Sequence, residues 1–525
     1  MSLIPSSVVS VVSRTWRRVA IPAEYRVVWR VRDLRLLAMS RFWSNLMFYS
    51  TVIVAFERSR GLTFTQMFLL ESILSAAAWL LDIPTGVWAE LIGYRRLLLL
   101  ARVFELTSLI VTIFAYGFWP FAFGAVLYGA HLACASGSED ALVYASLPVT
   151  STLPVVDGAL ALNGDIAVGA STLDGASALV GAAGDAAPSD NAQLGAAAFA
   201  LLGAANSAGF CVGLALGSFI GARSPTLAVV ATVIPMTLAL VVTLRLSASP
   251  SATPHHTALA NDSLPTAPIA DELAATQAHG VAPHVALVAP ADAPTRLTVR
   301  ELLVMSRRLL LAQPALVALS LGQSASFALV NAIFWYNQPY FATTGIAVRW
   351  YGPLTALAVG CALVAPLAMP GAIRRIGRRW ALAGALLAPG LAYLGLGLLT
   401  GVPLRQHASL GWLSPTLTVG LIVFVVGGSA WRDPLIGDEL ARRSPVRGRA
   451  AALSALSFVG TLAGIALNPL IGRVGDAGLR AVGLALGGGL IALAISLPWL
   501  LQRAPTTPTA APPLTPPVMN ASRPT

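Results

Sequence analysis

The chain has 525 residues, of which 56% are hydrophobic and only 11% are charged. Soluble domains carry about a quarter charged residues, so this composition excludes an ordinary soluble protein and indicates a polytopic membrane protein. The net charge of +11 comes from arginine in clusters between apolar runs, which favours topology signals over a nucleic-acid partner.

Continuous apolar runs define the predicted elements. A helix of roughly 20 residues crosses the 30 Å hydrocarbon core of a bilayer, and twelve such runs occur in two sets of six. The runs are 36–57, 63–87, 97–118, 121–146, 193–221 and 224–246, then 311–338, 347–371, 380–402, 411–431, 450–472 and 478–502. Because they are rich in Leu, Ala and Gly and do not alternate, we predict an all-α fold of twelve transmembrane helices rather than a barrel.

Segments of different composition separate the two sets. The predicted parts are a basic cytoplasmic arm 1–35, a six-helix bundle 36–246, a cytoplasmic linker 247–310, a second bundle 311–502 and a cytoplasmic tail 503–525. The linker and the tail are rich in Pro, Ala and Thr, and we expect both to be disordered. Residues 148–192 form an Ala/Gly/Asp-rich insertion in the first bundle, which we expect to be an external loop.

Arginine positions predict the orientation. With the amino terminus inside, 26 arginines fall in inner segments and 7 in outer ones, and Arg41 lies within the first run. Cytoplasmic loops retain positive charge, so we predict that both termini are cytoplasmic. We also expect a monomeric, multi-pass protein of the plasma (inner) membrane.

The two sets of helices carry matching sequence features. Gly93-Tyr94-Arg95-Arg96 recurs as Gly377-Arg378-Arg379-Trp380, each time between the second and third helix of its half. Gly209, Gly213, Gly217 and Gly221 in the fifth helix are matched by Gly460, Gly464, Asn468 and Gly472 in the eleventh. These ladders predict close packing of helix five with helix eight and of helix eleven with helix two.

This arrangement resembles the major facilitator superfamily from Leu36 to Leu501. Gly86-x-x-Ala89-Glu90-x-x-Gly93-x-Arg95-Arg96 resembles its loop motif between helices two and three, with Glu90 where the family has Asp. Residues 82–86 and 136–144 resemble a bacterial branch of drug-efflux-like permeases. The resemblance implies an alternating-access transporter, coupled to protons, that exports an amphipathic or hydrophobic small molecule.

The loop motif has two possible roles, as a topology marker or as a latch. Its residues are Asp82, Gly86, Glu90, Gly93, Arg95 and Arg96. In the second interpretation the two halves are joined by Glu90 near the amino end of helix eleven, where the helix dipole favours an anion. The second-half copy has Arg374 at the matching position, so this latch is one-sided.

Ionisable side chains inside the runs are costly and are therefore the candidate sites. Arg41, Asn45 and Tyr49 are spaced by four residues and would form one face of helix one, although Arg41 could instead extend to the inner surface. Glu71, Glu139 and Asp140 are candidate proton-coupling acids, with structural pairing to arginine as the alternative. Glu105 and His131 are weaker candidates for the same role.

Helix seven is unusually polar for a membrane span. Its amides and aromatic rings suit a solute-binding surface, and the candidate cavity residues are Gln323, Asn331, Trp335 and Gln338. The alternative is that the aromatic rings lie at the outer membrane interface.

Other function classes have less support. An uptake symporter or facilitator for a small nutrient could use the same helices, and so could a transport-inactive scaffold or sensor. The sequence has no phosphate-binding Walker loop, nucleophile elbow or metal-protease helix, so we do not expect an enzyme. We expect no cofactor and no metal, and the partners predicted are lipid, a small solute and protons.

Overall fold

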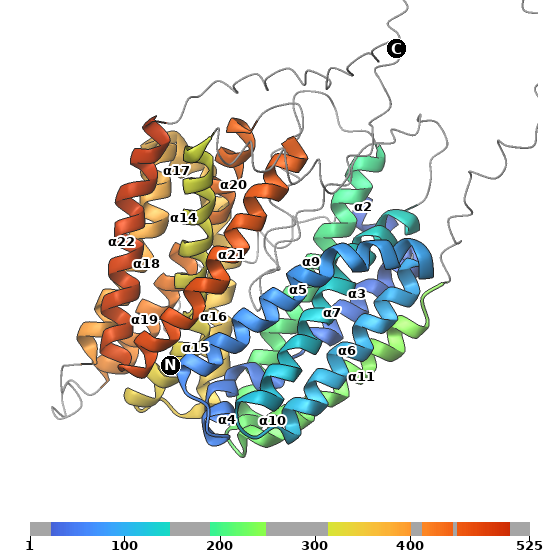
Figure 1. The fold of residues 1–525 in the computed structure, drawn as a ribbon, viewed down its shortest axis with the longest axis horizontal. Helices are drawn as coiled ribbons and strands as arrows, with labels where there is room; N and C mark the ends of the chain where they lie inside the picture. The colour runs from blue at the N-terminus through green and yellow to red at the C-terminus, as the bar shows by residue number, and fades with distance from the viewer. Residues whose placement is uncertain (1–22, 148–189, 248–312, 401–411, 445–448, 504–525) are drawn as a thin grey trace, which may run out of the picture.

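A computed structural model describes residues 23–147, 190–247, 313–400, 412–444 and 449–503. In these residues the regular structure is helical and contains no strand. Figure 1 shows two groups of long helices, one from each half of the sequence, that lie side by side. The prediction of an all-α polytopic fold is therefore confirmed.

The described part of the first half begins with a short helix at the end of the predicted basic arm. Its elements are α2 (Ala23–Arg30), α3 (Arg32–Ser44), η1 (Phe48–Thr51), α4 (Ile53–Ser59), α5 (Phe64–Ile92), α6 (Tyr94–Phe114), α7 (Phe118–Ser146), α9 (Asp190–Gly221), α10 (Pro225–Ala231) and α11 (Val233–Leu244). The second half contains α14 (Pro314–Asn331), α15 (Ile333–Thr343), η3 (Val348–Trp350), α16 (Tyr351–Val364), η4 (Ala365–Ala368), α17 (Met369–Ile376), α18 (Arg378–Leu399), α19 (Leu413–Gly428), α20 (Arg432–Arg443), α21 (Arg449–Asp476) and α22 (Leu479–Arg503).

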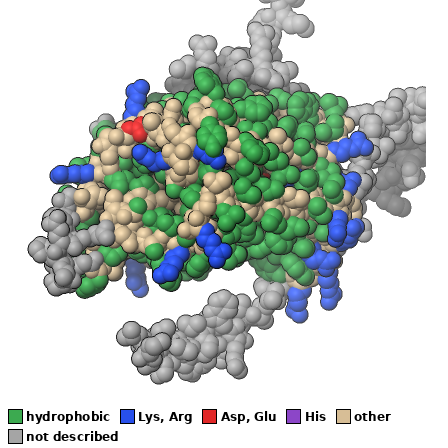
Figure 2. All heavy atoms as spheres, turned by 90° about the horizontal axis from the view of Figure 1, so that it is seen from below, with side chains coloured by type: hydrophobic (Ala, Val, Ile, Leu, Met, Phe, Trp, Pro, Cys, Tyr) green, Lys and Arg blue, Asp and Glu red, His purple; other side chains and the backbone are tan. Residues whose placement is uncertain are grey.

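Eleven helical segments in the described residues are long and apolar enough to cross a membrane, judged by length and composition. Large apolar side chains lie exposed on them, including Phe114, Trp119, Leu367 and Ile495, each more than 70% exposed. Such surface is unfavourable in water and favourable against lipid. Figure 2, a view from below Figure 1, shows broad apolar areas with arginine side chains projecting at the rim.

The predicted first span, 36–57, is not a continuous helix. The chain leaves the α-helix after Ser44, forms the short turn η1 and resumes as α4, which is why this segment is missing from the eleven spans. The carbonyl oxygen of Arg41 accepts both from the backbone N–H of Asn45 at 3.1 Å and from the Asn45 side-chain amide at 3.0 Å. The first helix of the fold is therefore discontinuous.

Backbone-to-backbone packing holds this break in place. The glycines of α9 face it, because a Cβ atom added at Gly209, Gly213 or Gly217 would overlap the backbone between Phe42 and Phe48. The ladder of helix five thus packs mainly on helix one, a contact that the sequence does not predict.

The two predicted helix pairs also pack closely. Gly352 of α16 lies against the carbonyl oxygen of Leu214 in α9, and Gly472 of α21 lies against Phe64 and Thr65 of α5. Both predictions from the glycine ladders are confirmed, and both contacts join the two halves.

The two ends of the molecule differ. We call the end that holds α2 the inner end, and the end that holds α4 and α10 the outer end (Figure 1). Leu246 shares a core cluster with Val28 of α2 at the inner end. Near the outer end of α9, Ser218 donates to the carbonyl oxygen of Arg349 in η3. The ends of the predicted insertion lie at the inner end, because Leu147 contacts Gly195 and both α7 and α9 join the core cluster that contains Val28 and Leu246. The two ends of the insertion and helix α2 therefore lie at the same end of the molecule. The predictions of an external insertion and of a cytoplasmic amino terminus cannot both be right. Residues 148–189 themselves lie outside the described residues.

Contacts between the halves gather toward the outer end. The outermost of these contacts are hydrogen bonds from Phe64 and Thr65 to Asp476. Further inward, Ser72 donates to the carbonyl oxygen of Ile465 at 2.7 Å. The innermost ring contact between α5 and α21 is that of Trp79 with Phe458, with centroids 4.5 Å apart. Helices α5 and α21 are thus an antiparallel pair across the seam, bonded at their outer ends.

Candidate functional site

A buried network of arginines and carboxylates lies in the first half, between α3, α6 and α7. Its centre is Arg102, whose side chain is 3% exposed. Its guanidinium group bonds to Glu105 at 3.1 Å and to Glu139 at 2.7 Å, and it donates to the hydroxyl of Ser44 at 2.6 Å. One arginine thus joins three helices.

Arg41 extends the network toward the end of α3. Its Nε donates to Glu139 at 2.5 Å, and its Nη2 lies 3.5 Å from Asp140. Glu139 is therefore held between two guanidinium groups and is buried. Arg41 and Asp140 form the open edge of the network, with side chains 24% and 23% exposed.

His131 and Ser44 complete the interior. Nδ1 of His131 lies 3.0 Å from the carbonyl oxygen of Ala101, which can only accept, so Nδ1 carries a proton. Nε2 then faces Glu105 at 3.9 Å. The hydroxyl of Ser44 donates to Glu105 at 2.5 Å.

The charges of this network do not balance. It holds three carboxylates, Glu105, Glu139 and Asp140, against two guanidinium groups. Buried charge is unfavourable unless it is paired, so the extra negative charge favours uptake of a proton or approach of a cation. Asp140 is the carboxylate best placed to accept either, because it lies at the open edge and its contact with Arg41 is the longest.

Two further acids of the first half lie apart from the network. Glu71 of α5 and Glu57 of α4 interact electrostatically with each other. Among the described residues neither has an ion-pair partner, and Oε2 of Glu57 is buried without a hydrogen bond. Glu71 is among the predicted proton-coupling acids, whereas Glu57 is not, because Glu57 lies at the end of the predicted first span.

The predicted stripe of Arg41, Asn45 and Tyr49 does not form. A stripe requires one continuous helix, but Asn45 ends α3 and Tyr49 lies in η1. Only Arg41 of the three joins the network, while the Tyr49 hydroxyl lies 3.7 Å from the sulfur of Met47.

The candidates of helix seven divide between its two segments. Gln338 of α15 is buried in the seam between the halves, where it accepts from the backbone N–H of Val54 and donates to the carbonyl oxygen of Ser50, both at 3.2 Å. The Trp335 ring packs on Phe68 of the first half, with centroids 5.7 Å apart. Gln323 and Asn331 lie half-buried on α14.

The loop motif adopts the same backbone shape in both halves. Gly93, between α5 and α6, has φ of 88°, and Gly377, between α17 and α18, has φ of 79°. A side chain rarely tolerates this conformation, which explains why the repeat has glycine at both positions. Asp82 hydrogen-bonds Ser136 of α7, and Gly86 has open space around it.

Among the described residues, the charged side chains of the motif form no ion pair or hydrogen bond with the second half. Arg95 donates to the carbonyl oxygen of Leu244 at 2.7 Å, within the same half. Glu90 and Arg96 are exposed. Side chains 449–452 at the amino end of α21 lie outside the described residues, so a Glu90 latch stays a prediction.

The second half has a smaller ionic group at the corresponding place. Arg432 of α20 is 3% exposed, bonds to its neighbour Asp433 at 2.5 Å and donates to the carbonyl oxygen of Ser326 at 3.0 Å. Arg432-Asp433-x-Leu435 matches Glu139-Asp140-x-Leu142 in the first half. Arg102 and Arg432 are therefore buried within the helix bundles. The prediction of orientation counts both among the arginines of cytoplasmic segments.

Comparison with known proteins identifies the fold. No protein-family model and no curated protein matches this sequence. The solved structure of a variant of the nucleoside transporter NupG has a TM-score of 0.57 at 12% identity, and the match covers 89% of this chain and 98% of that one. A D-xylose-proton symporter has a TM-score of 0.56 at 14% identity, with 92% of this chain and 99% of that chain covered.

A variant of the peptide transporter POT in complex with sulfate is also similar, with a TM-score of 0.55 at 15% identity over 90% of this chain and 94% of that one. The chain has the major facilitator fold. At such low identity the likeness concerns the fold and not the solute, because one fold carries many functions.

Proposed function

We propose that this protein is a secondary active transporter that works by alternating access and is coupled to protons. The observation that carries the proposal is the buried network around Arg102, with its extra carboxylate, beside a break in the first helix. Ionisable groups in a membrane bundle are expensive and mark pathways for ions and solutes, and discontinuous helices are frequent at such sites.

Asp140 is the proposed site of proton loading. Glu139 is bound by Arg41 and Arg102, which favour its charged form, whereas Asp140 is partly exposed and has one long contact. A proton on Asp140 would leave the network with equal numbers of positive and negative groups. Glu71 is a second candidate in the same half, because no cationic partner is described for it.

The direction of transport and the solute remain part of the proposal. The resemblance to efflux permeases favours export of an amphipathic or hydrophobic molecule. The structural neighbours include a transporter of nucleosides and a D-xylose-proton symporter, so uptake of a small nutrient has equal support. A transport-inactive scaffold or sensor is the remaining alternative.

Flux measurements in proteoliposomes test the coupling. A panel of lipophilic cations, nucleosides, sugars and peptides is screened first by solute counterflow, and a responding solute is then driven by an imposed pH gradient. We expect Asp140→Asn to reduce gradient-driven flux by about tenfold or more, in the range of measured coupling energies, while counterflow continues.

The matched control is Asp433→Asn, since Asp433 is 22% exposed and is also paired with arginine, but lies in the other half. Unchanged gradient-driven flux in Asp140→Asn, Glu139→Gln and Glu71→Gln would exclude proton coupling through these acids. No flux of any solute under any gradient would favour the scaffold.

A further inference from the structure

The amino end of α5 is bonded by a carboxylate from the opposite half. Asp476, the last residue of α21, accepts from the backbone N–H of Phe64 at 2.8 Å with Oδ1. With Oδ2 it accepts from the backbone N–H of Thr65 at 3.1 Å and from the Thr65 hydroxyl at 2.6 Å. One side chain thus makes three hydrogen bonds between segments more than 400 residues apart in the sequence.

These bonds complete the capping of α5. Thr63 already caps the helix from within, since its hydroxyl accepts from the backbone N–H of Gln66 and the Gln66 side chain accepts from the Thr63 N–H. The N–H groups of Phe64 and Thr65 remain, and a helix leaves its first N–H groups without internal partners. Asp476 takes both, and its negative charge also suits the positive end of the helix dipole.

The surroundings of Asp476 are built for close approach. Gly472, one turn earlier in α21, has no room for a side chain, because a Cβ atom there would lie 2.6 Å from Cα of Thr65. Arg58, also in the first half, interacts electrostatically with Asp476 and lies over the Phe64 ring.

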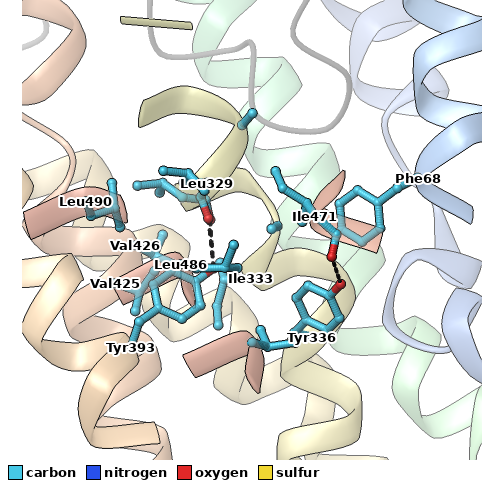
Figure 3. Close-up of a cluster of buried hydrophobic side chains, with 14 of the residues drawn as sticks. Phe68, Leu329, Ile333, Tyr336, Tyr393, Val425, Val426, Ile471, Leu486 and Leu490 are labelled. Carbon is cyan, nitrogen blue, oxygen red and sulfur yellow. Dashed lines mark hydrogen bonds between the residues drawn. The ribbon is translucent and has the colours of Figure 1, made fainter. Parts of the chain in front are cut away.

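Neighbouring contacts extend the same seam. The Tyr336 hydroxyl donates to the carbonyl oxygen of Ile471 at 2.9 Å, and the Tyr336 ring stacks on Phe68, as Figure 3 shows. Gln338 bonds the backbone on either side of Val52 in the broken first helix. The seam therefore closes the outer end with directional bonds as well as apolar packing.

We propose that Asp476 is the outer latch between the two halves: it holds α5 and α21 together while the outer end is closed and releases α5 when that end opens. The register of this antiparallel pair supports a reciprocal arrangement. Phe64 lies opposite Asp476, Ser72 opposite Ile465 and Trp79 opposite Phe458. Continued along both helices, this register brings Glu90, in the last turn of α5, opposite the amino end of α21.

Each helix of the pair thus carries a carboxylate for the amino end of the other. Halves that rock as rigid bodies cannot close both ends of one helix pair at once, so the two carboxylates act in opposite conformations. This proposal rests on the proposed transport cycle only for the motion that opens and closes the outer end. The latch itself can be measured without solute or gradient.

Distance measurements between the halves test the latch. Spin labels on cysteines introduced at Arg223 and Arg480, exposed residues at the outer ends of opposite halves, report outer opening of the full-length protein in lipid nanodiscs. The background has Cys134, Cys211 and Cys361 replaced by serine. We expect Asp476→Ala to raise the ratio of outer-open to outer-closed molecules about fivefold, with Asp476→Asn showing a smaller rise.

The matched control is Thr63→Ala, which removes the internal cap of the same helix end but no bond between the halves. Thr65→Val removes one of the three bonds without altering Asp476, and we expect a partial shift in the same direction, which also decides the matter if Asp476→Ala does not fold. The latch is excluded if Asp476→Asn and Thr65→Val both give the wild-type distance distribution, or if Thr63→Ala opens the outer end equally. Failure of solute flux in the screen above would leave these distances unaffected.

Discussion

At the scale of single residues, the unexpected group is Arg102. The sequence places it in an apolar run with Glu105 three positions later, a spacing that allows a pair on one helix face. Its bonds to Ser44 and Glu139 come from other helices, and no local pattern predicts them. Arg102 therefore neutralises carboxylates from two helices, α6 and α7, and bonds a hydroxyl group from a third, α3.

Loss of Arg102 should destabilise the protein strongly. Arg102→Gln leaves Glu105 and half of the Glu139 pairing without a cation, and breaking a buried ion pair costs about 3 to 5 kcal/mol. We expect a lower melting temperature in detergent, partly restored by adding Glu105→Gln. Arg442→Gln, which alters an exposed arginine 64% accessible to solvent, should have little effect. Equal melting temperatures for Arg102→Gln and the wild type would show that the network is not structural.

At the scale of elements, α9 explains why the first helix breaks. Its glycines allow the backbone from Phe42 to Phe48 to lie directly on the helix, and Val52 fills the space at Gly221. A continuous helix at 36–57 fits the hydropathy of the sequence equally well, because hydropathy does not report backbone approach. Packing against α9 is what selects the broken form.

Gly217 of α9, which lies against Phe48 at the start of η1, should tolerate no side chain. Gly217→Ala would place Cβ in steric overlap with the carbonyl oxygen of Phe48, and overpacking of this kind costs about 1 to 3 kcal/mol. Gly464→Ala in α21 is the control, since nothing lies within 4 Å of its Cβ position. There the better helix propensity of alanine should give a gain of up to about 1 kcal/mol. The melting temperatures of both variants are compared with that of the wild type. The prediction is wrong if both substitutions shift the melting temperature in the same direction.

At the scale of the whole molecule, the two halves have the same plan with different chemistry. The glycine turns at Gly93 and Gly377 are alike, whereas the ionic groups around Arg102 and Arg432 differ in size. The first half carries the larger buried ionic network, and the second half contributes Asp476 to the seam. Such asymmetry is consistent with the proposed cycle, in which one half binds the proton and both halves move.

The two carboxylates of the α5 and α21 pair should act in opposition. Glu90→Gln is expected to lower the ratio of outer-open to outer-closed molecules, and Asp476→Asn to raise it. Because the sites lie at opposite ends of the helices, their effects should add, and the double variant should return toward the wild-type distribution. The spin-label pair at Arg223 and Arg480 measures all three variants. A shift of both single variants in one direction would refute the reciprocal arrangement.

The sequence alone determined the all-helical membrane fold, the division into two similar halves and the positions of almost all spans. The length and hydropathy of a segment are local properties, and they decide whether that segment can span a bilayer. It also located Glu139 and Asp140, since acids are rare in apolar runs. The tertiary structure alone decided the break in the first helix, the pairing of Arg102 and the cap that Asp476 places on α5. Each of these depends on which distant segments come together, and a hydrogen bond or a backbone contact across hundreds of residues leaves no periodic signal in the chain.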